Sequence, residues 1–129
     1  MSDKFTVEII SPDKLILNSE ANEVIIPSYE GQMGILKDHI PLITFLRPGV
    51  ISVQNQDEKK YFVEEGTVEF SKNNLLILTS TARDLTELKQ NSIEDLLNQA
   101  EKQLSDNNSS DKEKYLLSYK INTLKEINQ

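Results

Sequence analysis

Asp38 and His39 are the neighbouring residues of this sequence best suited to catalysis, because a carboxylate and an imidazole supply two members of a hydrolytic triad. A triad also needs a nucleophile, and the sequence contains no Gly-x-Ser-x-Gly turn of the kind that presents a reactive serine. A small hydrolase that gathers Asp38, His39 and a serine in one pocket stays open as an alternative. Since a lone histidine is more often a surface or hydrogen-bonded structural residue, we expect no catalytic residue in this chain.

Metal and phosphate sites lack their usual ligands. The sequence has no cysteine and a single histidine, His39, so a zinc site built from His and Cys has too few ligands. Gly31 and Gly34 lack the longer spacing and the following Lys-Ser/Thr of a phosphate-binding loop, which makes a bend the better interpretation. Neighbouring acids such as Glu64 and Glu65 point to opposite faces of a strand and cannot share a site. We therefore expect no bound metal or cofactor.

The composition argues against two classes of partner, nucleic acids and the interior of a membrane. The formal net charge is −7 and three basic residues never follow one another, whereas nucleic-acid binding normally needs a clustered positive surface. No apolar run approaches the roughly 20 residues of a membrane-spanning helix. We expect no nucleic-acid partner, and any association with a membrane must be indirect.

Stepping along the chain, residues 5–81 form short segments rich in Val, Ile, Phe and Thr, separated by turn residues, a pattern typical of an all-β sandwich or barrel. Phe5, Val7 and Ile9 alternate with polar residues, which places them on one face of a strand. The strands are expected at residues 5–9, 15–17, 23–26, 44–46, 50–53, 60–63, 67–70 and 75–79.

The connections carry recognisable turn residues. Residues 47–50 suit a type II turn, in which Gly49 would adopt a positive φ. Residues 54–57 and 71–74 are predicted to be hairpin loops. The segment 27–41 is rich in glycine and proline yet apolar, so we expect an ordered loop there.

The hydrophobic period changes after Arg83. One apolar helical stripe is formed by Ile93, Leu96, Leu97, Ala100 and Leu104. Ser92 with Asp95 resembles a capping box that would begin this helix. The polar residues 105–109 then interrupt the stripe.

A second helix is predicted from Ser110 or Asp111, with Glu113 three residues after the serine as in a capping box. Its apolar side holds Leu117, Ile121 and Leu124 and is widened by Tyr115, Leu116 and Tyr119. Because a short polar link favours antiparallel neighbours, the two helices are expected to form a hairpin.

Residues 30–44 read EGQMGILKDHIPLIT and meet every named position of the pattern E-G-x-x-G-(I/V)-L-x-x-H-x-P-L-(L/I)-(T/S). Residues 46–51 match L-x-P-G-x-(I/V), and residues 63–70 match V-x-G-G-x-(L/V)-x-(V/F) except that Glu65 replaces the first glycine. These patterns are those of the epsilon subunits of F-type ATP synthases, which the chain resembles in order from about residue 4 to residue 125.

The resemblance implies a mainly β protein with an α appendage: a flattened β-sandwich of about ten strands over residues 1–84, then an antiparallel α-helical hairpin over residues 85–129. It implies a non-catalytic rotor component of the central stalk that couples proton translocation to ATP synthesis. The implied partners are the gamma subunit and the c-ring, with contact of the hairpin to alpha and beta subunits. The implied location is the cytoplasmic face of the bacterial inner membrane, as a peripheral protein held there through the c-ring.

The family's ring-facing loop corresponds to the segment around residues 29–39. The resemblance therefore implies these contact residues for the c-ring or gamma subunit: Glu30, Gln32, Met33 and His39. Met33 would offer adaptable apolar area and the others hydrogen bonds. The plainer alternative is that Met33 belongs to the core and that Gly31, Gly34 and Pro41 only shape the loop.

Some family members bind ATP through a motif (I/L)-D-x-x-R-A on the first helix. Aligned from Ile93, the aspartate position holds Glu94, the arginine position Leu97 and the alanine position Asn98. No arginine follows Arg83, and a guanidinium fork is the usual bidentate phosphate ligand. We predict that the hairpin does not bind ATP with useful affinity.

In other members the hairpin inhibits ATP hydrolysis through basic side chains. The surplus of acids after Arg83 argues against that role here, while four lysines leave it open: Lys112, Lys114, Lys120 and Lys125. A stand-alone adaptor, in which the hairpin recognises an unrelated protein, remains the other alternative.

Overall fold

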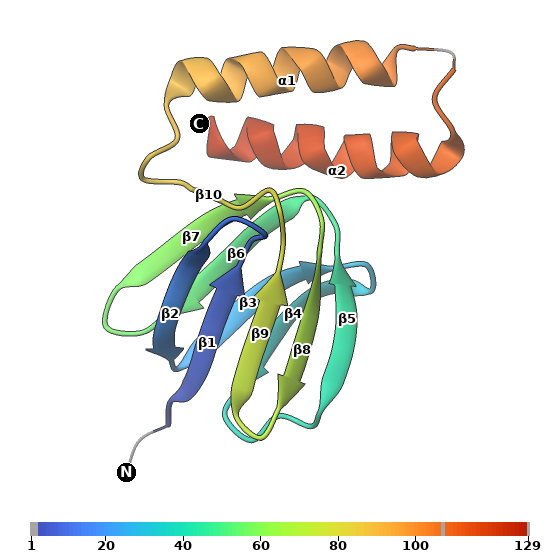
Figure 1. Ribbon diagram of the computed structural model, residues 1–129. Coiled ribbons are helices and arrows are strands. Elements are labelled where there is room, and N and C mark those ends of the chain that lie inside the picture. Colours follow the sequence, from blue (N-terminus) through green and yellow to red (C-terminus); the bar gives the residue numbers. More distant parts are fainter. Residues whose placement is uncertain (1–2, 107, 129) are drawn as a thin grey trace. The chain divides into compact units, whose positions relative to one another are not determined.

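The computed structural model describes residues 3–106 and 108–128 and contains ten strands and two helices in that part of the chain (Figure 1). The strands are β1 (Phe5–Ile10), β2 (Leu15–Ala21), β3 (Glu23–Ser28), β4 (Gly31–Leu36), β5 (Leu42–Leu46), β6 (Gly49–Gln54), β7 (Glu58–Val63), β8 (Gly66–Ser71), β9 (Asn74–Leu78) and β10 (Arg83–Asp84). The helices are α1 (Gln90–Leu104) and α2 (Asp111–Ile127). The chain divides into two compact units, one ending at Leu85 and the other beginning at Thr86.

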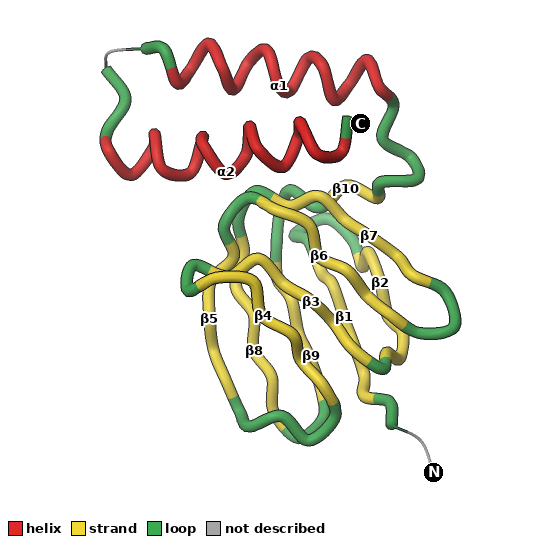
Figure 2. The backbone as a smooth tube through the Cα atoms, turned by 180° about the vertical axis from the view of Figure 1, so that it is seen from behind, coloured by secondary structure: helices red, strands yellow, loops and turns green. Residues whose placement is uncertain are grey.

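The first unit is one sheet folded over on itself into two layers, so the expected mainly β sandwich is confirmed. The strand order is β10-β7-β6-β3-β5-β8-β9-β1-β2, with β4 paired to β3. Figures 1 and 2 show the layer of β5, β8, β9, β1 and β2 facing the layer that contains β3, β4 and β6. In the described part of the chain, the sheet passes from one layer to the other where β3 pairs with β5 at one position, Ser28 with Leu46. Asn22 links β2 directly to β3, and its backbone N donates to the carbonyl of Gln54, the last residue of β6, at 2.8 Å.

The inward side chains of both layers form the core. Phe5, Val7 and Ile9 are buried, as their alternation predicts. Together with residues from the other strands they make one apolar cluster. Its other members are Leu17, Ala21, Val24, Ile26, Ile35, Leu46, Ile51, Val53, Tyr61, Val63, Val68, Phe70, Leu75 and Ile77. Close packing of these side chains holds the two layers together.

Strand β4 corrects the expected loop at residues 27–41. Residues 31–36 pair antiparallel with β3 along its whole length, from Ser28 opposite Gly31 to Glu23 opposite Leu36. Ile35 is fully buried in the core. The two glycines concealed a strand whose exposed positions are Gln32, Gly34 and Leu36.

The type II turn predicted for residues 47–50 was wrong, because Gly49 has no positive φ. Position 49 requires glycine for a steric reason: a Cβ there would stand 2.5 Å from Cβ of Pro27 on β3. The hairpin loops predicted at 54–57 and 71–74 are confirmed. In the second, Lys72 and Asn73 both have positive φ, as a type I′ turn requires.

The second unit is the expected helical hairpin. Helix α2 begins as predicted, since Ser110 Oγ accepts a hydrogen bond from Glu113 N at 3.1 Å. Helix α1 begins earlier than predicted: Lys89 is its N-cap without any side-chain bond, so the capping box at Ser92 was wrong. In the described residues, neither helix has both the length and the hydropathy needed to cross a bilayer.

Candidate functional site

The four contact residues implied by the resemblance do not gather in one place. Glu30 lies exposed in the turn between β3 and β4, and Gln32 is exposed on β4. Met33 is half-buried and packs against the core, whereas His39 follows the far end of β4. The six residues of β4, at about 3.3 Å each, separate Glu30 from His39 by roughly 20 Å. These residues therefore mark two ends of the sandwich rather than one site.

The loop that carries His39 is fastened to the β8–β9 turn. Asp38 N donates to Asn73 Oδ1 at 2.7 Å, and Asn73 Nδ2 donates back to Asp38 Oδ1 at 3.0 Å. Both residues have left-handed backbone conformations, with φ of 66° and 60°. This reciprocal pair, the Asp38–Asn73 clasp, holds two strained turns together and fixes the position of the loop.

His39 is placed as a structural side chain. Its ring meets Phe70 edge to face, with 6.0 Å between the ring centroids, and Nδ1 lies 2.7 Å from the Ile40 carbonyl oxygen. The Asp38 carboxylate accepts a hydrogen bond from Asn73 Nδ2, and the described residues show no hydrogen bond between Asp38 and His39. The two are not arranged as an acid and a base. Within the described ranges, no three His, Asp or Glu side chains are grouped so as to hold a metal ion.

The outer face of the layer β5-β8-β9-β1-β2 carries a feature that the sequence interpretation missed. The strand register places five residues side by side in a line across the layer: Phe45, Thr67, Leu78, Ile10 and Leu15. We call this line the apolar row. Phe45, Leu78 and Leu15 are 56%, 44% and 53% exposed. Ile43, two residues before Phe45 on β5, is 76% exposed.

A line of large exposed apolar side chains on one sheet face is typical of an interaction surface. Strand β5 gave a signal that could have pointed to it. Its inner positions are buried, as Leu46 shows, yet its outer positions Ile43 and Phe45 are as apolar as the inner ones. A strand that is apolar on both faces is usually covered on both faces. The rest of the apolar row depends on register and could not be read from the sequence.

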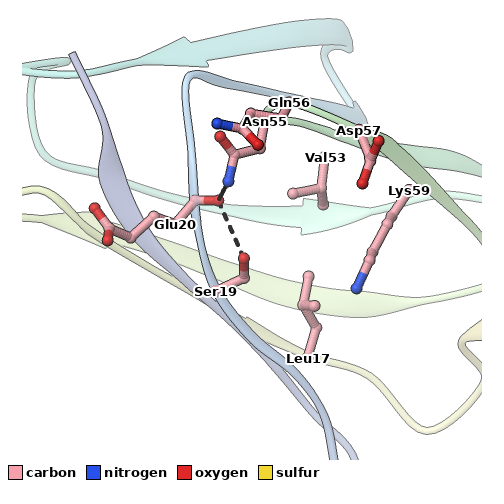
Figure 3. A pocket seen from close by; sticks show the side chains of 8 residues that line it. All are labelled: Leu17, Ser19, Glu20, Val53, Asn55, Gln56, Asp57 and Lys59. Carbon is pink, nitrogen blue, oxygen red and sulfur yellow. Dashed lines mark hydrogen bonds between the residues drawn. The ribbon is translucent and has the colours of Figure 1, made fainter. Parts of the chain in front are cut away.

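A cavity of about 210 Å³ lies where β2 faces the β6–β7 hairpin (Figure 3). Asn55 Nδ2 and Ser19 Oγ both donate to the Glu20 carbonyl there, at 3.1 and 3.2 Å, while the Glu20 carboxylate points away. The other polar residues that line it are Gln56, Asp57 and Lys59. The Asn55 amide and the Ser19 hydroxyl are bonded to the backbone of Glu20, so these groups stabilise this side of the sandwich.

The positions of the ATP motif lie on α1. Ile93 is buried and Glu94 is exposed, with its Oε1 3.5 Å from the Gln90 amide. Leu97, at the arginine position, is half-buried on the apolar side of the helix, and Asn98 is exposed. None of these side chains is a cation that could meet a phosphate.

Residues 4–84 match a family model described as the β-sandwich domain of the ATP synthase delta/epsilon chain. The chain is 44% identical to an ATP synthase epsilon chain of Pelagibacter ubique (strain HTCC1062), over 99% of this chain and 100% of that relative. It is 31% identical to an ATP synthase epsilon chain of Parvibaculum lavamentivorans, over 98% of this chain and 97% of the relative.

Solved structures share the fold. A chain in a cryo-EM structure of the Euglena gracilis mitochondrial ATP synthase, containing OSCP, F1 and the c-ring, superposes with a TM-score of 0.82 at 18% identity, covering 100% of this chain and 84% of that one. A chain of the Tetrahymena thermophila mitochondrial ATP synthase, from its central stalk and c-ring, gives a TM-score of 0.70 at 16% identity, covering 96% of each chain.

Proposed function

The chain belongs to the ATP synthase epsilon chain family, and from this premise we propose that it is a non-catalytic rotor component of the central stalk. In this role it couples proton translocation to ATP synthesis without making or breaking a bond itself. A stiff, closely packed body suits the transfer of torque, and the continuous core of the first unit supplies one.

The apolar row is the observation that carries this proposal. The large apolar side chains of Phe45, Leu78 and Leu15 are exposed on one face. Exposing them to water is unfavourable for a protein without a partner, whereas covering them contributes binding free energy. We assign this face to the gamma subunit, which would cover it permanently. The sandwich, residues 1–84, is thereby the binding domain.

The two ends of β4 are assigned to the c-ring and the adjoining part of the gamma subunit. Glu30 and Gln32 are exposed and offer hydrogen bonds at one end. His39 stands at the other end in a loop that the Asp38–Asn73 clasp holds rigid. Met33 packs against the core, so only its exposed part would serve a partner. Through these contacts the chain would lie peripherally at the cytoplasmic face of the bacterial inner membrane.

The test is restoration of coupling. Synthase stripped of this chain should regain proton-driven ATP synthesis when the purified chain is added back. Ile43→Asp places a charge beside the apolar row and should prevent this restoration, because covering an unpaired carboxylate is costly. Gln56→Asp adds the same charge in the exposed β6–β7 loop and should restore coupling fully. Full restoration by Ile43→Asp, or full coupling without the chain, would refute the proposal.

The hairpin, residues 85–129, is proposed as the regulatory domain, which would contact alpha and beta subunits and control ATP hydrolysis. Its second helix carries four lysines that could meet acidic partners: Lys112, Lys114, Lys120 and Lys125. A chain ending at Leu85 keeps the whole first unit. Synthase rebuilt with it should hydrolyse ATP at a different rate, and an unaltered rate would contradict a regulatory hairpin.

A further inference from the structure

Glu65, the residue that replaces a glycine of the family pattern, lies in the link between β7 and β8 and is held by the link between β9 and β10. Its backbone carbonyl accepts from Thr79 Oγ1 at 2.6 Å. Its Oε1 accepts from Ser80 N at 3.2 Å and from Ser80 Oγ at 2.6 Å. Three hydrogen bonds therefore fix both the backbone and the carboxylate of an exposed residue.

The carboxylate is fixed but its charge is not neutralised. Both bonds from Ser80 reach Oε1, and no described residue donates to Oε2 of Glu65. The ion pairs of the sandwich involve other acids, Glu64 with Arg83 and Glu58 with Lys60. Glu65 thus presents a negative charge with one free oxygen in a defined direction.

This charge stands over an apolar floor. A shallow pocket of about 350 Å³ is lined by Ile10, Ser11, Pro12, Glu65, Leu78, Thr79 and Ser80. Ile10 and Leu78 also belong to the apolar row, so the pocket continues that row past the ends of β1 and β9. A partner that covers the row must also cover the pocket or leave a charge half-desolvated at its rim.

We propose that this pocket receives a lysine or arginine side chain of the subunit that covers the apolar row, with the cation bound to Glu65. The aliphatic stem of such a side chain would lie on Ile10, Pro12 and Leu78, and its head would donate to Oε2. The hydrogen bonds from Ser80 orient the carboxylate before binding, which lowers the entropy lost when the pair forms. The inference rests on the proposed function, because it assumes that the gamma subunit covers the row.

The experiment measures the Kd of the purified chain for the purified gamma subunit at low and at high salt. Glu65→Gln keeps an oxygen for Ser80 but removes the charge, so it should raise the Kd about five- to twentyfold at low salt and much less at high salt. The melting temperature should stay at the wild-type value. Asp57→Asn removes an exposed charge from the β6–β7 loop and should leave the Kd unaltered.

A second arm identifies the partner residue. Glu65→Lys should weaken binding further, and reversing one lysine or arginine of the gamma subunit to glutamate should recover most of the loss. An unaltered Kd for Glu65→Gln at low salt would overturn the inference. If Phe45→Thr weakens binding while Glu65→Gln does not, the pocket inference alone fails. If neither variant weakens binding, the assignment of the row to the gamma subunit fails.

Discussion

Replacing Phe45 by threonine tests whether a partner covers the apolar row. Threonine is β-branched and, like phenylalanine, suits a strand, and Phe45 points away from the core, so the fold should be preserved. The variant removes an aromatic ring of which the isolated chain leaves 56% exposed to water. A loss of binding would therefore report the partner's contact and not a loss of folded protein.

The size of the effect follows from the exposed area. An aromatic side chain buries about 150–250 Å² when fully covered, so a side chain that is 56% exposed leaves roughly 110 Å² for a partner. At about 25 cal/mol per Å², covering that area contributes roughly 2.8 kcal/mol. This energy corresponds to about a hundredfold in Kd. Because threonine retains a methyl group, the expected loss is between about tenfold and a hundredfold.

Isothermal titration calorimetry with the purified gamma subunit measures this loss, and the heat capacity change of binding should become less negative as apolar contact is removed. Gln56→Thr is the control, since Gln56 is exposed in the loop between β6 and β7, which belongs to the other layer. It should leave binding of the gamma subunit within about twofold. Equal Kd values for Phe45→Thr and the wild-type chain would refute the reasoning.

Three further predictions concern the fold and the hairpin. Gly66→Ala should cost about 2–4 kcal/mol in urea unfolding, because its Cβ would stand 2.6 Å from the Leu78 carbonyl oxygen, whereas Gly31→Ala, with no atom within 4 Å, should cost less. Asn73→Gly keeps the left-handed turn but removes both bonds to Asp38, so the Asp38 amide should exchange with deuterium about tenfold faster or more; unaltered exchange would contradict the clasp. ATP should show no millimolar or tighter binding to the chain in calorimetry, since Leu97 stands where the motif has arginine.

Much of the architecture could be predicted because the pattern within a short segment of sequence matched the structure that this segment forms. The alternation of Phe5, Val7 and Ile9 predicted a strand with one buried face, and the structure buries all three. The pattern of Ser110 with Glu113 predicted the start of α2, where the serine caps the helix. In both cases the physical cause lies within a few residues of the signal.

The errors arose where the cause lies far away in the chain. Gly49 is a glycine because Pro27 on another strand approaches it, and no local pattern records that contact. Residues 31–36 looked like a loop because Gly31 and Gly34 conceal their alternation, while pairing with β3 makes them a strand. Ser92 has the spacing of a capping residue, yet the helix already begins before it.

The candidate contact residues show the same difference between signals that are local in the sequence and causes that lie far away in the chain. Motif agreement pointed to Glu30 and His39, but could not show that β4 holds them far apart. The apolar row needed the register of five strands, because Phe45 and Leu15 become members of one line only through the three strands between them.

The single paired position between β3 and β5 has a mechanical consequence. Within each layer, force passes from strand to strand through ladders of hydrogen bonds, but β3 and β5 are joined only around Ser28 and Leu46, by the bonds Tyr29 N to Phe45 O and Arg47 N to Pro27 O. A twisting force applied to one layer must therefore reach the other mainly through interlocked core side chains. The torsional stiffness of this body then depends on how tightly residues such as Ile35 and Phe70 fill the space between the layers, so that removing one methyl group there softens the sandwich without altering its surface.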